Sequence, residues 1–301
     1  MLAKSNCSPA VLYANARSRR GQQWFAEAVE YLRKEELELK EATLMRDPAK
    51  LDQAVEKAVK GGVPMVIVGG GDGTLSGVAK HFVGSDATLG ILPLGTGNAF
   101  ARDLMIPANL PAACSVISRG KTREVDLGFV QDKYFVNVVT VGLTARIATE
   151  LTNEAKRRFG RAAYLFAMAR ALQRVEPFHV KITTPEQTLE FDTLQVVIGN
   201  GRFHAGPFPL APDASITEGR LSGYALATTS KGSFFRLAWK LHAGRQCELP
   251  EVYAISTVGG RLETSPVRKV VVDGEIEGTT PFDFRVAPKA IRVRVPEEFE
   301  G

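Results

Sequence analysis

Glycine residues and one aspartate form the first segment of the chain that could bind phosphate. The segment is Gly69-Gly70-Gly71-Asp72-Gly73-Thr74, and five apolar residues, 64–68, lead into it. An apolar run without alternation is typical of a strand covered on both faces. Because the residues from Thr74 onward favour a helix, the glycines lie at a strand-to-helix turn, where the backbone can approach a ligand closely. The N-terminus of that helix offers free N–H groups to a phosphate.

Asp72 adds a carboxylate to this first glycine loop, residues 69–74. A carboxylate beside a polyanion is unfavourable unless it holds a cation or accepts a proton or hydrogen bond. Mg²⁺ takes oxygen ligands and bridges phosphates, so Asp72 is predicted to be a Mg²⁺ ligand with a catalytic role. The alternative is a purely structural turn. The chain contains neither a P-loop motif nor a Rossmann glycine motif at a strand end, so neither of those nucleotide sites is supported.

A second glycine loop follows about one βαβ repeat later, in the segment Leu92-Pro93-Leu94-Gly95-Thr96-Gly97-Asn98. It too lies between an apolar strand, residues 89–91, and a predicted helix, residues 99–104. Two such turns on neighbouring parallel strands meet at one edge of the sheet, where open α/β sheets bind ligands. The two loops are therefore predicted to hold a triphosphate between them.

The sequence GGGDGT followed by LPLGTGN resembles the diacylglycerol kinase catalytic-domain family, the lipid kinases that include sphingosine and ceramide kinases. The likeness is greatest to soluble bacterial lipid kinases that act on diacylglycerol or phosphatidylglycerol. A GGDG segment alone also occurs in NAD kinases and phosphofructokinases, whereas the two motifs at this spacing are specific. The resemblance extends over nearly the whole chain. It implies a kinase with ATP as phosphoryl donor, Mg²⁺ as cofactor and a lipid as acceptor.

The same resemblance implies further nucleotide contacts near the N-terminus. The family has roughly Asn-Pro-x-Ser-Gly-Lys after its first strand, and Asn15, Ser18 and Arg20 match that pattern in order. Arg20 is predicted to contact ATP phosphates, because a guanidinium binds phosphate in a bidentate manner. The alternative, given equal weight, is that the arginines of this loop are ordinary surface residues. Thr43 matches a threonine that borders the nucleotide in relatives, and by itself would be an ordinary strand-end residue.

An acidic turn late in the chain is the candidate for the catalytic base. The segment Val271-Val272-Asp273-Gly274-Glu275 places acids on both sides of a glycine, and Asp-Gly by itself favours a surface β-turn. Relatives carry Asp-Gly-Glu or Asp-Gly-Asp here, and their last acid is the proposed general base. The resemblance therefore implies that Glu275 takes the proton from the lipid hydroxyl as it attacks the γ-phosphorus.

Four further positions complete the comparison with the family. Glu218 stands where relatives usually have an aspartate associated with a structural cation, so it is predicted to be a metal ligand, with a side chain one methylene longer. Ala99 stands where bacterial diacylglycerol kinases mostly have aspartate and where sphingosine and ceramide kinases often have alanine. Asp103, one helical turn further, would compensate in part. Asp126 is predicted to fix a hinge, to orient a cation ligand or to make structural hydrogen bonds.

The composition of the chain indicates where in the cell it acts and which classes of partner it binds. The chain has 301 residues and a net charge of +5, and it contains no apolar run near the roughly 20 residues of a membrane span. Its three cysteines are scattered, and its N-terminus lacks a signal-peptide core, which predicts a cytoplasmic protein. A basic balance without a nucleic-acid-binding motif favours phosphorylated ligands or peripheral contact with the inner face of a membrane. The sequence leaves a homodimer open.

The distribution of strands and helices predicts two domains. Residues 1–122 alternate strands with helices, which indicates an open, mostly parallel α/β sheet like that of NAD kinases and phosphofructokinases. Residues 123–301 are rich in strands and predict a mainly antiparallel β-sandwich for the lipid, with the extreme C-terminus packed back on the first domain. The predicted strands of the first domain are residues 10–14, 36–43, 64–68 and 89–91, and those of the second are 124–130, 134–141, 179–184, 189–199, 221–228, 252–257, 269–272 and 291–295.

Two helices are predicted in the second domain, at residues 154–174 and 234–243. Lys156, Arg157, Arg158 and Arg161 precede an apolar stretch in the first of them, and this pattern favours packing on a sheet over contact with an anionic membrane. Two other functions compete with the lipid kinase. An NAD kinase shares the GGDG segment but does not explain LGTGN or Asp-Gly-Glu, and a non-catalytic nucleotide-binding membrane sensor would not need the retained acids.

Overall fold

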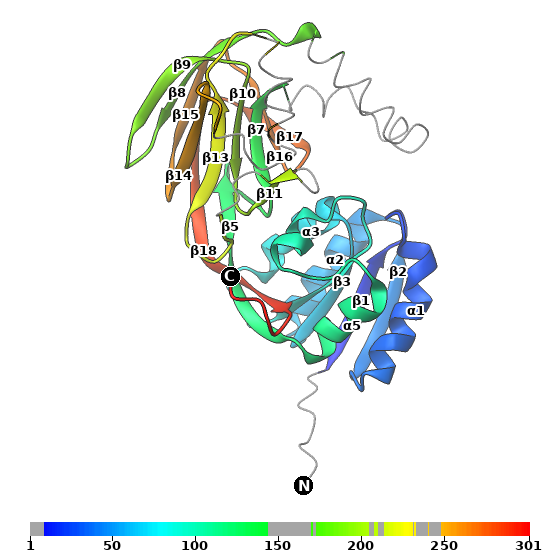
Figure 1. The fold of residues 1–301 in the computed structure, drawn as a ribbon. Helices are drawn as coiled ribbons and strands as arrows, with labels where there is room; N and C mark the ends of the chain where they lie inside the picture. The colour runs from blue at the N-terminus through cyan, green and yellow to red at the C-terminus, as the bar shows by residue number, and fades with distance from the viewer. Residues whose placement is uncertain are drawn as a thin grey trace.

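A computed structural model describes residues 9–143, 170, 173–204, 208–209, 214–230, 232, 240 and 248–301. The predicted helices at 154–174 and 234–243, with the basic residues 156–161, lie largely outside these ranges. In Figure 1 the described chain forms a lower, helix-rich half and an upper half of long strands.

The first half alternates strands and helices as predicted. Its four strands lie side by side and parallel in the order β2-β1-β3-β4, and every residue of β3 is buried. The largest difference from a predicted boundary in this half is at β2, which begins at Leu39 rather than at residue 36, because Glu36 adopts a positive φ of 61° in the turn after the first helix. The elements are β1 (Ala10–Asn15), α1 (Gly21–Lys34), β2 (Leu39–Met45), α2 (Pro48–Lys60), β3 (Met65–Gly70), α3 (Asp72–Ala79), the 3₁₀ turn η1 (Lys80–Phe82), β4 (Thr88–Pro93), α4 (Ala99–Asp103) and α5 (Leu110–Arg119).

The second half packs two sheets face to face. A six-stranded antiparallel sheet has the order β14-β13-β10-β7-β16-β17, and strands β18, β15, β8 and β9 extend the first-half sheet. Buried side chains from both sheets form the core between them. The strands are β5 (Lys121–Val130), β6 (Lys133–Phe135), β7 (Val138–Gly142), β8 (Phe178–Thr183), β9 (Thr188–Thr193), β10 (Gln195–Gly199), β11 (Phe203–His204), β12 (Phe208–Pro209), β13 (Leu221–Leu226), β14 (Val252–Thr257), β15 (Gly259–Ser265), β16 (Lys269–Val272), β17 (Glu275–Thr279) and β18 (Phe282–Val295).

Two of the predicted strands are each divided where the chain changes sheets. The predicted strand 134–141 is β6 in the larger sheet followed by β7 in the six-stranded sheet, and 189–199 is likewise β9 followed by β10. The sequence gives no turn signal at either break, so each pair of strands is expected as one run. Strands β15 and β17 and the first half of β18 were not predicted, since charged and glycine residues interrupt their apolar pattern.

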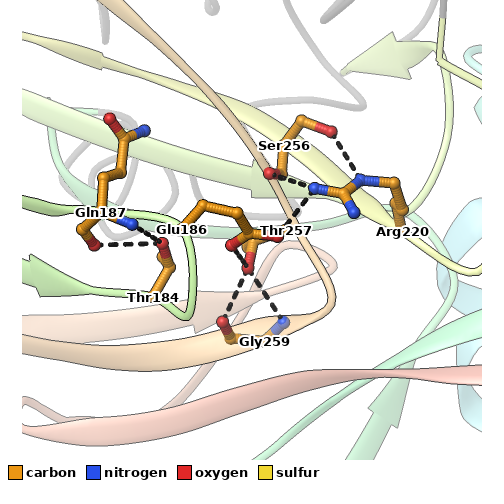
Figure 2. A network of polar contacts seen from close by, with 7 residues as sticks. All are labelled: Thr184, Glu186, Gln187, Arg220, Ser256, Thr257 and Gly259. Atoms are coloured by element: carbon orange, nitrogen blue, oxygen red, sulfur yellow. Dashed lines mark hydrogen bonds and ion pairs between the residues drawn. The ribbon is translucent and has the colours of Figure 1, made fainter.

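Polar contacts join the two sheets at one end of the second half (Figure 2). Glu186, in the turn between β8 and β9, accepts hydrogen bonds from Arg220 and from the Thr257 hydroxyl, both at 2.8 Å. Arg220 also donates to the Ser256 carbonyl oxygen at 2.7 Å. Because Glu186 belongs to one sheet and its partners lie at the ends of strands of the other, the network fixes the spacing of the two sheets at this end.

Strand β18 connects the two halves. Its early residues pair with β15, and near its end Arg292 and Val293 pair in parallel with Thr88 and Leu89 of β4. The C-terminal part of β18 thus returns to the sheet of the first half (Figure 1). The strand is irregular between Ala287 and the later pairs, so one continuous sheet turns from the first half into the second.

Candidate active site

A cleft of about 440 Å³ lies at the carboxyl ends of the first-half strands and is lined by both halves of the chain. That volume is within the usual range of small-molecule sites. Its wall contains seven of the predicted site residues: Asn15, Gly71, Gly73, Thr74, Gly95, Thr96 and Glu275. The other predicted residues occupy places behind or away from this wall in the described structure.

The two glycine loops touch each other, as predicted. Strands β3 and β4 pair up to Gly70, whose carbonyl oxygen accepts the N–H of Leu94 at 2.8 Å. A Cβ added at Gly95 would lie 2.6 Å from the Cα of Gly71, so a side chain there would force the loops apart. Glycine is therefore required because two backbones meet, in addition to any approach by a ligand.

Asp72 points from the first loop toward the second. Its Oδ1 accepts the backbone N–H of Phe100 at 3.2 Å, at the start of α4. Burial raises the pKa of the Asp72 carboxyl, and hydrogen bonds from the N–H groups of residues 98–100 oppose that increase. The carboxylate thus joins the two loops, a contact that the sequence analysis did not foresee.

Asn98 shapes the second loop from behind. It is buried and adopts a left-handed conformation with φ of 50°. Its Oδ1 accepts the N–H of Gly95 at 2.9 Å, and its Nδ2 donates to the Gly95 carbonyl oxygen at 3.1 Å. Thr96 and the Gly95 backbone, rather than the Asn98 side chain, face the cleft.

The turn after β1 presents different arginines from the one predicted. Arg17 and Arg19 line the cleft, whereas Arg20 lies over the ring of Trp24 at 4.3 Å and donates to the Ala108 carbonyl oxygen at 3.2 Å. Asn15 does line the cleft and donates to the Thr74 hydroxyl at 3.0 Å. The sequence contains three arginines in residues 17–20, but the family pattern singles out Arg20 alone as the phosphate contact.

Thr43 lies on the edge strand β2, and its hydroxyl donates to Glu41 Oε1 at 3.0 Å. The residues that line the cleft nearby belong instead to α2, namely Pro48, Leu51 and Asp52. These three were not predicted as site residues. The predicted contact of Thr43 with the nucleotide stays a prediction.

Glu275 reaches the cleft from a hairpin of the second half, and Asp273 fixes that hairpin. Asp273 and Gly274 form its turn with φ of 47° and 94°. The Asp273 carboxylate accepts the Ser76 hydroxyl of α3 at 2.6 Å and the N–H groups of Val136, Asn137 and Val138 at 2.8, 2.9 and 2.9 Å. One side chain therefore connects the first-half helix, the β6–β7 junction and the hairpin that bears the candidate base.

Two further carboxylates have structural partners. Asp126 is buried, and its two oxygens accept the N–H groups of Lys289 at 2.7 Å and Gly219 at 2.6 Å, so its hydrogen bonds are structural. Asp103 accepts the N–H of Arg202 at 2.8 Å, and its other oxygen is buried without a partner among the described residues. Burial, followed by smaller effects that include the charge of Asp72, raises the pKa of Asp103 to about 7.

Glu218 is exposed, beside the Gly219 that binds Asp126. The described ranges contain no group of three or more His, Cys, Asp or Glu side chains placed to bind one metal ion. The cation site at Glu218 stays a prediction from the resemblance.

Two family models match consecutive parts of the chain. The diacylglycerol kinase catalytic domain matches residues 9–130, and the YegS C-terminal NAD kinase beta sandwich-like domain matches residues 137–295. The chain belongs to the diacylglycerol kinase family of lipid kinases. The family expected from the two glycine loops is thereby confirmed, and with it the lipid kinase class of the enzyme.

Relatives of this lipid kinase agree with the assignment. A probable lipid kinase YegS-like of Pseudomonas aeruginosa is 33% identical over 80% of each chain, and a diacylglycerol kinase of Mycobacterium tuberculosis is 30% identical over 79% of each. An uncharacterized protein of Synechocystis is 32% identical, and the chain spans 59% of its length. A putative diacylglycerol kinase from Bacillus anthracis has a crystal structure with a TM-score of 0.84, 23% identity and coverage of 98% and 97% of the two chains, which supports the fold.

The described part of this lipid kinase has no helix that is both long and apolar enough to cross a bilayer.

Proposed function

We propose that this lipid kinase uses ATP and Mg²⁺ to phosphorylate a hydroxyl of a membrane lipid such as diacylglycerol or phosphatidylglycerol, with a sphingoid lipid as the other acceptor class. The observation that carries the proposal is one cleft that is lined by both glycine loops and by Glu275. Phosphoryl transfer requires positioned phosphates, positive charge and a base, and this cleft brings residues suited to each requirement together.

The first half binds the donor. The loops present backbone N–H groups at the carboxyl ends of β3 and β4, and the N-terminus of α3 adds its positive dipole end. Arg17 and Arg19 bring positive charge from the β1–α1 turn, and Thr96 brings a hydroxyl. Triphosphate binding between the loops needs no side chain at Gly71 or Gly95, where one would also separate the loops.

Asp72 is the carboxylate that fits the Mg²⁺ of such a reaction. It is partly exposed, its Oδ1 accepts the N–H of Phe100, and its neighbours Gly71 and Gly73 line the cleft, so the carboxylate lies beside the proposed phosphate site. Mg²⁺ typically takes one or two protein carboxylates and completes its shell with water and substrate phosphates, so a larger protein cluster is not needed. When bound, the ion would neutralise charge that develops on the transferring phosphoryl group.

Glu275 is the base in this proposal. It is exposed at the start of β17 and lines the same cleft as the loops, so a lipid hydroxyl entering between the halves meets its carboxylate. The carboxylate removes the hydroxyl proton as the oxygen attacks phosphorus. Asp273 does not react; its four hydrogen bonds hold the hairpin against α3 and so fix the distance between the base and the donor.

The acceptor places the enzyme at a membrane surface. Ile276, next to Glu275 in β17, is 47% exposed and offers apolar surface on the hairpin that carries the base. The net charge of +5 favours approach to an anionic leaflet. Peripheral binding would let a lipid present its hydroxyl without leaving the membrane completely.

The test is transfer of labelled γ-phosphate from ATP, with Mg²⁺, to lipids in mixed micelles. The panel contains diacylglycerol, phosphatidylglycerol, sphingosine and ceramide, with NAD as a control acceptor. Label on one of the lipids supports the proposal and identifies the acceptor. Label on NAD, or ATP binding without transfer to any panel lipid, contradicts it.

A further inference from the structure

Asp52 is a carboxylate in the wall of the cleft that plays no part in the phosphate and base contacts described above. It lies on α2 one helical turn after Pro48, and Pro48, Leu51 and Asp52 all line the cleft. The side chain of Asp52 is 33% exposed, so it is accessible to a ligand in the cleft. An acid near a triphosphate is unfavourable unless it holds a cation, as proposed for Asp72, or faces a different part of the nucleotide.

Two side chains of η1, the 3₁₀ turn that follows α3, hold Asp52 in place. Its Oδ1 lies 2.8 Å from His81 Nε2 and 3.2 Å from Lys80 Nζ, while within the described part of the chain Oδ2 has only a 3.5 Å contact with Lys80. Because a carboxylate only accepts hydrogen bonds, the Nε2 of His81 carries the shared proton. The His81 side chain is just 10% exposed. These contacts orient the carboxylate and leave Oδ2 with capacity to accept from a ligand.

The face of α3 that lines the cleft near Asp52 carries no side chains at two positions. Gly73 and Gly77 are one helical turn apart, and both line the cleft. A Cβ added at either glycine would meet no described atom within 4 Å. The helix backbone is therefore open to a ring-sized group between α2 and α3, and Val78 and Leu51 provide apolar surface beside it.

The chemistry of a nucleoside triphosphate decides which part can contact Asp52. The triphosphate only accepts, so Asp52 must face a donor, and the donors are the ribose hydroxyls and the amine of the base. Ribose is the group attached directly to the phosphates, and Gly77 lies about 6 Å along α3 from Gly73, a distance suited to the sugar. Two adjacent hydroxyls match the two oxygens of one carboxylate, as in dinucleotide sites where an acid binds the ribose 2′-hydroxyl.

We propose that Asp52, held by His81 and Lys80, accepts hydrogen bonds from the ribose hydroxyls of the bound nucleotide and makes the site selective for ribonucleotides. This inference rests on the proposed use of ATP by the cleft. It adds a sugar-binding position on α2 that belongs to neither glycine motif.

The experiment measures equilibrium binding of Mg²⁺ complexes of ATP, 2′-deoxy-ATP, 3′-deoxy-ATP and purine riboside triphosphate, which lacks the base amine. The full chain is compared with Asp52→Ala and Asp52→Asn. We expect the unmodified protein to bind ATP about tenfold more tightly than either deoxynucleotide, and Asp52→Ala to reduce that ratio to about one. The Asp52→Ala substitution should weaken the binding of purine riboside triphosphate by the same factor as it weakens the binding of ATP.

Glu56→Gln is the matched control for Asp52→Asn. Glu56 lies one turn further along α2, is paired with Lys60 at 2.7 Å and carries the same charge. We expect this variant to retain the preference for ATP over its deoxy forms. An unchanged preference in Asp52→Ala, or an effect confined to nucleotides with the base amine, would overturn the ribose assignment while ATP binding itself still stood. Failure of the unmodified protein to bind ATP would instead refute the proposed function on which the inference rests.

Discussion

The two sides of the cleft are built differently. On the first-half side, the ligand-facing groups are mainly backbone atoms of loops that directly follow paired parallel strands. On the second-half side, the contribution is one carboxylate, Glu275, on a hairpin whose turn is tied to α3 by Asp273. Asp273 and Ser76 are separated by 197 positions in the sequence. Donor binding therefore depends on local structure, whereas the position of the base depends on how the halves meet.

The comparison predicts that damage to the loops abolishes both binding and transfer, while damage to the hairpin affects transfer alone. The largest effect is expected for Gly95→Val. Its Cβ would lie 2.6 Å from Gly71 Cα and 2.7 Å from Asn98 Oδ1, so the loops must separate. We expect ATP affinity to fall more than about 100-fold, measured by equilibrium binding, because several phosphate contacts are lost together.

Circular dichroism and thermal unfolding accompany that measurement, so that loss of the fold is not mistaken for loss of the site. A folded Gly95→Val protein that binds ATP normally would show that contact between the loops is not needed for the donor site.

The hairpin gives the second expected effect. Asparagine at position 273 has one oxygen where the carboxylate has two, so it cannot accept from Ser76 and from the three N–H groups as Asp273 does. We expect Asp273→Asn to lower kcat about 10- to 100-fold through misplacement of Glu275, with the KM for ATP changed less than about twofold. Ser76→Ala removes one of the four bonds and should give a smaller decrease. Equal losses in kcat and ATP affinity would mean that Asp273 supports the donor site as well.

The third prediction distinguishes two arginines of the turn after β1, on the donor side of the cleft. Arg19 lines the cleft, but Arg20 is engaged with Trp24 and the Ala108 carbonyl oxygen. We expect Arg19→Ala to raise the KM for ATP about tenfold, because a charged hydrogen bond to phosphate is lost. Arg20→Ala is the matched control and should change that KM less than about twofold. The reverse order of effects would return the phosphate contact to Arg20.

Sequence alone was a better guide to the first half than to the second. The apolar run 64–68 and the glycines after it determine a buried strand and its turn locally, and the structure confirms both. The break between β6 and β7 was not predictable in that way, because it depends on the distant Asp273. Arg19 and Asp52 were missed for a related reason: their exposure to the cleft follows from packing of α1 and α2, which no local motif encodes.

The smallest effect concerns Asp103, behind the second loop. Burial is the main cause that raises the pKa of Asp103 to about 7. At pH values between the ordinary aspartate pKa and 7, folding is therefore accompanied by the uptake of a proton. The contribution of Asp103 to stability is therefore present at low pH and is lost as pH rises toward and through 7. We expect Asp103→Asn to be the more stable protein at pH 8, on the order of 2 kcal/mol, and to lose that advantage near pH 4.

Denaturant unfolding of both proteins at several pH values measures this difference. In Asp103→Asn the amide oxygen can still accept the N–H of Arg202. This hydrogen bond is therefore present in both proteins, and the substitution tests only the titration of the carboxyl. A stability difference that does not vary with pH would show that Asp103 does not titrate in this range.

The most direct test of the central claim, that two unlike sides form one phosphoryl-transfer site, is the comparison of ATP binding and turnover in Glu275→Gln. Glutamine keeps the size of the side chain and removes the base. We expect an ATP Kd within about twofold of that of the unmodified protein and a kcat about 1,000-fold lower on the accepted lipid. Turnover near the unmodified level would contradict the assignment of Glu275 as base, and loss of ATP binding with turnover would contradict the division of the cleft into a donor side and a base side.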